Sequence, residues 1–179
     1  MSEALIDATW RWLQQVVVGL NLCPFAAGPL RAGTIRMTCC GDADWNTMLE
    51  RLAEEATRLM QWEPSEVSTT LLLLPSVGSF GDLLDVVGAG EALLQALSLS
   101  EEVQLVAFHP DFQYQENPDP NDPANLTNRS PTPLIHLLRT ADVAEVVAQH
   151  PDTTAIPLAN AVLLRAMGHD AVDALWRST

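Results

Sequence analysis

Apolar residues recur every three or four positions along much of the chain, the spacing that places them on one face of an α-helix. The stretch from Glu3 to about Leu20 shows this pattern and predicts a deeply packed helix. A second helix is predicted between Asp44, which can cap it, and Pro64, which stops it. A third runs from Phe80 to about Leu97, where Gly88-Ala89-Gly90 allows a kink or a short break.

Three short runs of residues with β-strand character alternate with these helices. They are Thr34–Cys39, Val67–Leu74 and Val103–Phe108, the second of them almost continuously apolar, as in a strand buried on both faces. Strand, helix, strand, helix, strand is the order of right-handed βαβ units. We therefore predict an α/β fold with a small three-stranded, mostly parallel sheet (βαβαβ) that is flanked by helices.

The last third of the chain is predicted to be helical. Its segments are Thr132–Arg139, Val143–Gln149 and about Ala155–Met167, followed by a final turn around Ala171–Trp176. His169 follows a glycine at a helix end and is expected on the surface. A chain of 179 residues is long enough for one core but hardly for two, so residues 1–179 are predicted to form a single domain.

The charge of the chain excludes several classes of function. The formal net charge is -14, from 23 acidic and nine basic residues, and every basic residue is an arginine. An acidic chain repels polynucleotides and anionic membranes, so neither is an expected partner. Without lysine there is no Schiff base, no lysine for pyridoxal phosphate and no nucleotide-binding P-loop. The expected partner is a small molecule.

The cysteines and the N-terminus indicate the compartment. Cys23, Cys39 and Cys40 form no C-x-x-C pair, and their odd number fits no closed set of disulfides. The first residues include two acids and lack the basic leader of a signal peptide. No apolar run approaches the roughly 18–20 residues that span a bilayer. We therefore expect a cytoplasmic protein, and the sequence makes no prediction of its oligomeric state.

A long, proline-rich stretch starts where the third predicted strand ends. Irregular stretches longer than about 12–15 residues within a compact domain are usually functional or disordered. Ligands of open α/β sheets bind at the carboxyl ends of the strands, and His109 is the first residue beyond such an end. The sequence therefore predicts a site beside this stretch, formed by Cys23, His109, Asp111, Arg129, His136 and Arg139.

The residue types in this set suit a metal-assisted enzyme. Cys23, His109 and His136 would bind a divalent transition metal, zinc or iron, with Asp111 as a fourth ligand or as the hydrogen-bond partner of a ligand. The spacing contains no close ligand pair of the C-x-x-C or H-x-x-x-H kind.

The same residue types also suit a thiolate enzyme. Cys23 precedes a proline that can start a helical turn, and a thiolate is favoured by the positive end of a helix dipole. Asp111 would orient the imidazole of His109, and Arg129 would hold an anionic group of a small substrate. The further substrate-binding candidates are Asn128 and Arg139.

Each of these side chains also has a structural interpretation. Cys23 is then a small buried residue, His109 a hydrogen-bonding residue at a strand end, and His136 a core histidine. The alternative to an enzyme is a non-catalytic module that binds a ligand or a protein through residues 110–130.

Three segments together resemble the signatures of a bacterial family known as domain of unknown function 1415. They are NLCPFA (21–26), FHPDFQY (108–114) and TNRSPTPLIHLLR (127–139). The family usually has FHPDYQF, so Phe112 and Tyr114 are exchanged here, and it usually has an acid where this chain has Thr140. The resemblance covers nearly the whole chain and implies a single-domain α/β protein, without implying a reaction.

Overall fold

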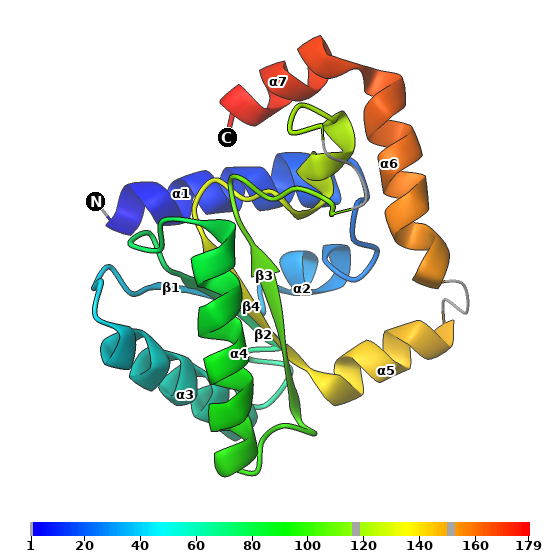
Figure 1. The fold of residues 1–179 in the computed structure, drawn as a ribbon. Coiled ribbons are helices and arrows are strands. Elements are labelled where there is room, and N and C mark those ends of the chain that lie inside the picture. Colours follow the sequence, from blue (N-terminus) through cyan, green and yellow to red (C-terminus); the bar gives the residue numbers. More distant parts are fainter. Residues whose placement is uncertain (1, 116–118, 150–152) are drawn as a thin grey trace.

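The computed structural model describes residues 2–115, 119–149 and 153–179, and it forms a mixed sheet with helices on both faces (Figure 1). Two separate apolar clusters fill the space between the sheet and these helices. The predicted α/β class is confirmed, and so is a helical C-terminal part. In the described parts of the chain, no helix combines the length and the apolar character that a bilayer crossing requires.

The sheet has four strands in the order β1-β2-β4-β3. The strands are β1 (Ile35–Cys39), β2 (Thr69–Leu73), β3 (Val103–Phe108) and β4 (Leu134–Arg139). β1 and β2 are parallel, whereas β4 lies between β2 and β3 and runs antiparallel to both. The three predicted strands are confirmed, but the prediction of a three-stranded, mostly parallel sheet is wrong.

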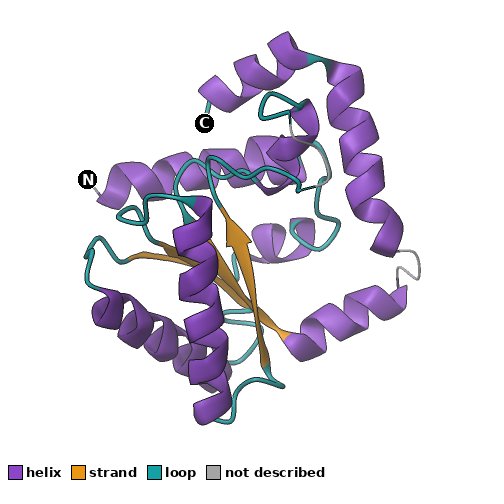
Figure 2. Cartoon of the chain, in the orientation of Figure 1, coloured by secondary structure: helices purple, strands orange, loops and turns teal. Residues whose placement is uncertain are grey.

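The error arose at Leu134–Arg139, which was predicted as part of a helix and is strand β4 (Figure 2). β4 is central in the sheet and both of its faces are covered, so apolar residues follow one another without alternation. A short apolar run of this kind is compatible with a buried strand and with a buried helix. Because β4 is antiparallel, β1, β2 and β3 end at the edge where β4 begins, which we call the carboxyl edge.

Helices α3 (Trp45–Gln61) and α4 (Phe80–Ala96) cover one face of the sheet. The predicted Asp44 cap is confirmed, since its side chain accepts a hydrogen bond from the Thr47 N–H at 2.8 Å. Ser79 and Asp82 form a capping box at the start of α4. Both helices therefore begin next to the carboxyl edge with their first N–H groups satisfied.

α4 runs unbroken through Gly88 and Gly90, where the sequence predicted a kink or a short break. Gly90 is buried where α4 meets α3 and the sheet, and a Cβ there would lie 2.9 Å from Leu52 Cδ1 and 3.1 Å from Leu105 Cδ1. A Cβ on Gly88 would meet nothing within 4 Å. Gly90 thus permits close packing, whereas Gly88 only lowers helix propensity.

We expect Gly88→Ala to raise the free energy of unfolding by about 1 kcal/mol, because alanine is favoured over glycine in a helix by that amount. Gly90→Ala should gain less or destabilise the protein, because Leu52 and Leu105 must move. Urea unfolding of both variants measures the difference. Equal gains would contradict the close packing at Gly90.

The other face of the sheet is covered by α1 (Ser2–Trp12) and its π-helical continuation η1 (Leu13–Val18). Helix α6 (Ile156–Met167) packs mainly against residues 123–128 and joins the same apolar cluster through Leu164. The N-terminal helix and the later C-terminal helices are confirmed. The remaining elements are α2 (Ala27–Ala32), the 3-10 helix η2 (Pro123–Asn128), α5 (Thr140–Gln149), the 3-10 turn η3 (Thr153–Ala155) and α7 (His169–Arg177).

Candidate functional site

Two segments of the long predicted loop lie against each other at the carboxyl edge. The His109 N–H donates to the Asn128 carbonyl at 3.3 Å, and the Tyr114 N–H donates to Asn125 Oδ1 at 3.2 Å. Arg129 Nε donates to the Phe112 carbonyl at 3.0 Å. The loop is therefore tied to itself, and residues 116–118 lie outside its described part.

His109 lies at the end of β3 and is only 2% exposed. Its Nδ1 accepts a hydrogen bond from the Asp111 N–H at 3.0 Å, so the neutral ring carries its proton on Nε2. Nε2 is buried and has no hydrogen-bond partner among the described residues. Burial lowers the pKa of His109, against an opposite and smaller effect of the Asp111 and Asp82 carboxylates. His109 is therefore a neutral buried donor that an external acceptor would satisfy.

Asp111 acts on His109 mainly through its backbone. Its carboxylate is 81% exposed and lies 4.0 Å from His109 Nδ1, beyond hydrogen-bond distance. The ring of Phe80, the first residue of α4, lies 6.2 Å from the His109 ring and 5.3 Å from Phe112. His109 thus lies beside Phe80, which in turn packs on Phe112, on the α4 side of the sheet.

Arg129 is the predicted site residue with a clear opening beside it. Its Nε and Nη2 donate to the carbonyls of Phe112 and Pro120, the second at 2.8 Å. Nη1 makes no hydrogen bond with any residue in the described ranges. Burial lowers the pKa of Arg129, while Asp111 and Asp173 act in the opposite direction. The guanidinium remains charged, because arginine does not lose its proton in proteins.

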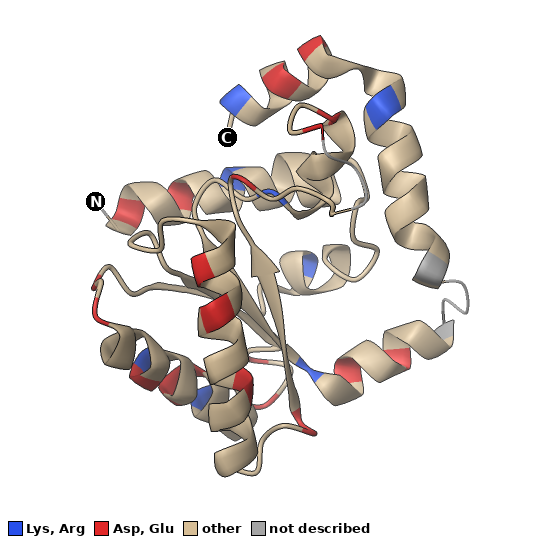
Figure 3. Ribbon diagram, in the orientation of Figure 1, with Lys and Arg blue, Asp and Glu red and all other residues tan. Residues whose placement is uncertain are grey.

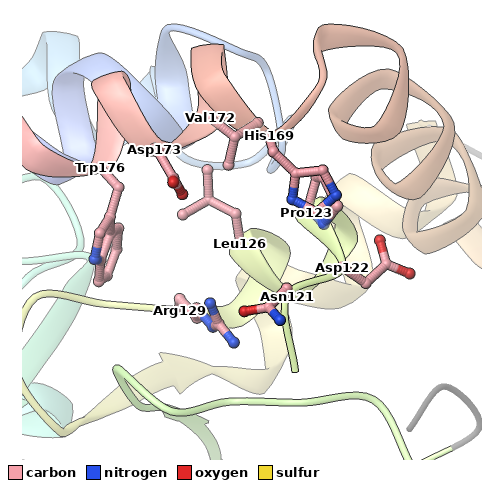
Figure 4. A pocket seen from close by; sticks show the side chains of 9 residues that line it. All are labelled: Asn121, Asp122, Pro123, Leu126, Arg129, His169, Val172, Asp173 and Trp176. Carbon is pink, nitrogen blue, oxygen red and sulfur yellow. The ribbon is translucent and has the colours of Figure 1, made fainter. Parts of the chain in front are cut away.

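Arg129 borders a groove of about 280 Å³ between η2 and α7, which we call the α7 groove (Figure 4). The lining residues are Asn121, Asp122, Pro123, Leu126 and Arg129 on one side and His169, Val172, Asp173 and Trp176 on the other. The Asp122 carboxylate is bound by Arg165 of α6 at 2.6 Å, and this pairing lowers its pKa. The charged groups of the groove are therefore the Asp122 carboxylate, which Arg165 neutralises, the exposed Asp173 carboxylate and the Arg129 guanidinium.

The sequence analysis did not predict that α7 lines the groove. His169 is exposed, as expected for a surface residue, but its ring also lines the groove against Pro123 (Figure 4). His169, Asp173 and Trp176 are spaced four and three residues apart, so they share one face of a helix. This spacing is visible in the sequence, but it does not indicate which segment that face of the helix packs against.

Cys23 lies apart from this groove. It contributes to the cluster on the α1 face of the sheet, whereas the ring of His109 packs beside Phe80 on the α4 face. As predicted, a turn follows Cys23, and the N–H groups of Phe25 and Ala26 favour the thiolate. Burial outweighs them and raises the pKa of Cys23, which opposes the predicted activation of this thiol.

His136 occupies the middle of β4, paired with Leu71 on one side and Val106 on the other. Thr69 Oγ1 donates to the Leu137 carbonyl at 2.7 Å, so the 2.6 Å contact between His136 Nε2 and Thr69 Oγ1 has the histidine as donor. Burial lowers the pKa of His136 to about 4. Its geometry is that of a satisfied core histidine.

The proposed metal ligands are not gathered in one place. Cys23 and His109 pack on opposite faces of the sheet, and His136 is hydrogen-bonded within it. Within the described ranges, no three His, Cys, Asp or Glu side chains are grouped so that they could hold a metal ion.

Arg139 ends β4 at the edge opposite His109. Its Nη2 donates to the carbonyls of Leu59, Trp62 and Val67, the last two at 2.6 and 3.1 Å. These groups belong to the end of α3 and the chain entering β2, so Arg139 ties α3 to the sheet. The structure does not place it beside Arg129.

The family model described as "Protein of unknown function (DUF1415)" matches residues 4–174, so the chain belongs to this family, as its three motifs predicted. The match extends from α1 into α7 and includes Arg129 and Asp173. No curated protein and no solved structure matches the chain.

Proposed function

We propose that this DUF1415 protein binds a small molecule through an anionic group that Arg129 receives in the α7 groove. The observation that carries the proposal is the state of the Arg129 side chain, which two backbone carbonyls hold in position beside the groove. A cation that is already fixed loses little side-chain entropy when it binds an anion.

The surroundings of Arg129 support a specific role. Acidic residues are spread over α3, α4, α5 and α7, and the few arginines are scattered among them (Figure 3). The described residues place Arg36, Arg58, Arg139 and Arg165 in contacts with acidic or carbonyl groups of the protein. Arg129 also lines a groove that a ligand can enter. Arg58 borders a second, more open hollow on α3, but its guanidinium is already paired with the Glu55 carboxylate at 2.7 Å.

The geometry favours binding over thiolate chemistry. The thiol of Cys23 is partly buried with a raised pKa, and its neighbours belong to the core cluster on the α1 face. The groove is slightly smaller than the roughly 300 Å³ at which pockets for drug-sized ligands begin. The proposed ligand is therefore a molecule of the size of an amino acid or a short organic acid.

The test is a titration of ¹⁵N-labelled protein with small carboxylates, read from the indole signal of Trp176. Glutarate, 4-methylpentanoate and 3-phenylpropionate serve as probes. Arg129→Gln should weaken their binding about tenfold or more, because a charge-assisted hydrogen bond is lost. Glutamine retains an amide donor for the Phe112 or Pro120 carbonyl, so the loop keeps a tie.

Two further variants make the result specific. Arg177→Met removes the same charge from exposed surface on α7 and should leave binding unchanged. Asn121→Trp fills the groove without removing the hydrogen bonds of Arg129 and should abolish binding. Binding that is unaffected by both Arg129→Gln and Asn121→Trp would overturn the proposal.

A further inference from the structure

We infer that the ligand of the α7 groove is a zwitterion of the amino-acid type, with its anionic group on Arg129 and its ammonium group on Asp173. This inference rests on the proposed function and adds the second recognition element. Both side chains line the same groove, one from the segment after η2 and the other from α7 (Figure 4).

The Asp173 carboxylate is placed to receive a cation. It makes no ion pair within 4.0 Å and no hydrogen bond with any residue of the described chain. It nevertheless acts on Arg129 across the groove, since its charge contributes to the pKa of that guanidinium. Asp122, the other carboxylate in the groove, is already bound by Arg165 through both of its oxygens. The free negative charge in the groove is therefore on Asp173.

Two opposite charges that face one groove without touching select for a ligand that carries both. A simple anion would gain from Arg129 but would be repelled by Asp173 and by a chain of net charge -14. A ligand with an added ammonium group turns the repulsion by Asp173 into attraction. The electrostatic pattern thus distinguishes an amino acid from the acid that lacks its amine.

Trp176 and Leu126 provide the remaining surface of the groove. Trp176 lies three residues after Asp173 on α7, and both side chains point to the side where Arg129 lies (Figure 4). An indole face favours an ammonium group placed next to it. Leu126 and Val172 are buried at the base of the groove and offer an apolar contact to the side chain of the ligand.

The experiment compares molecules that differ only in the amine. The pairs are glutamate and glutarate, leucine and 4-methylpentanoate, and phenylalanine and 3-phenylpropionate, titrated into the full chain as before. For at least one pair the amino acid should bind about tenfold more tightly than its partner. Asp173→Asn should remove that preference and leave the affinity for the acid without an amine equal or higher.

Asp170→Asn is the matched control, because it removes the same charge from the same helix at a position that does not line the groove. It should preserve the preference for the amine. The inference is overturned if no amino acid binds more tightly than its partner, or if the preference survives Asp173→Asn.

The inference and the proposed function fail in different ways. Equal, Arg129-dependent binding of both members of each pair would overturn the zwitterion and leave the anion site standing. If neither class of molecule binds in a manner that depends on Arg129, both are overturned.

Discussion

Replacing Glu55 with alanine should lower the free energy of unfolding by about 3 kcal/mol, because breaking a buried ion pair leaves its partners uncompensated. The Glu55 side chain is fully buried on α3. It accepts from Arg36 Nε at 2.7 Å, from Arg36 Nη2 at 3.0 Å and from Arg58 Nη1 at 2.7 Å. Arg36 and Arg58 keep about a third of their surface in solvent, which places the loss at the lower end of the range for such pairs.

The position of Glu55 explains why its loss affects the whole fold. Arg36 belongs to β1, which is the edge strand next to β2 in the described sheet, so this ion pair connects an edge strand to α3. The ring of Trp62 lies 5.3 Å from the Arg36 guanidinium and holds it in place. Removing the carboxylate releases β1 from α3 and leaves Arg36 and Arg58 without it, together with Arg51, which lies 3.9 Å from Glu55.

Urea unfolding measures the effect, and Glu54→Ala is the matched control. Glu54 precedes Glu55 on the same helix, is 57% exposed and, among the residues that the structure describes, pairs only with Arg51, at 3.5 Å. Its replacement should change the free energy of unfolding by no more than about 0.5 kcal/mol, as is usual for exposed pairs. Equal losses in the two variants would show that burial of the Glu55 pair is not the source of its effect.

The helices and strands that were predicted correctly from the sequence are those whose residue pattern depends on near neighbours in the chain. α3 has an aspartate cap and a helical stripe of apolar residues, and β2 is a continuous apolar run between turns. Both signals involve neighbours within a few residues. They are therefore visible without knowledge of the tertiary structure.

β4 was missed because its environment is decided by distant segments. LIHLLR is apolar on both sides since it lies between β2 and β3 and under helices on both faces. The error changed the predicted site. A helix after the loop would have placed His136 and Arg139 near His109. In strand β4, His136 instead lies within the sheet, and Arg139 lies at the edge opposite His109.

The candidate site shows the same limit. His109, Asp111 and Arg129 were predicted as site residues because the end of a strand and a long loop mark such places locally, and of these three Arg129 lines the α7 groove. The residues of α7 entered the groove through packing against η2, a contact between segments about forty residues apart in the chain. No local rule connects them, although their shared helical face was visible.

Because of His136, the free energy of unfolding should fall as the solution is acidified from about pH 6.5 to about pH 4. Its pKa is about 4 in the folded protein, below the ordinary value of 6.5, so the unfolded chain takes up the proton first. The contribution of His136 to the free energy of unfolding is therefore fully present above about pH 6.5. It is lost as the pH falls to about 4, the pKa in the folded protein. The total loss from this residue is up to about 3 kcal/mol, since one pKa unit corresponds to about 1.4 kcal/mol.

The measurement is urea unfolding across this pH range for the natural protein and for His136→Gln. Glutamine can still donate to Thr69 Oγ1 but does not titrate, so its variant should lose less stability on acidification, even if it starts lower at neutral pH. Other groups that titrate, including His109, act in both proteins and cancel in the difference. Identical slopes would mean that His136 takes up its proton as readily in the folded protein as in the unfolded chain, which its lowered pKa argues against.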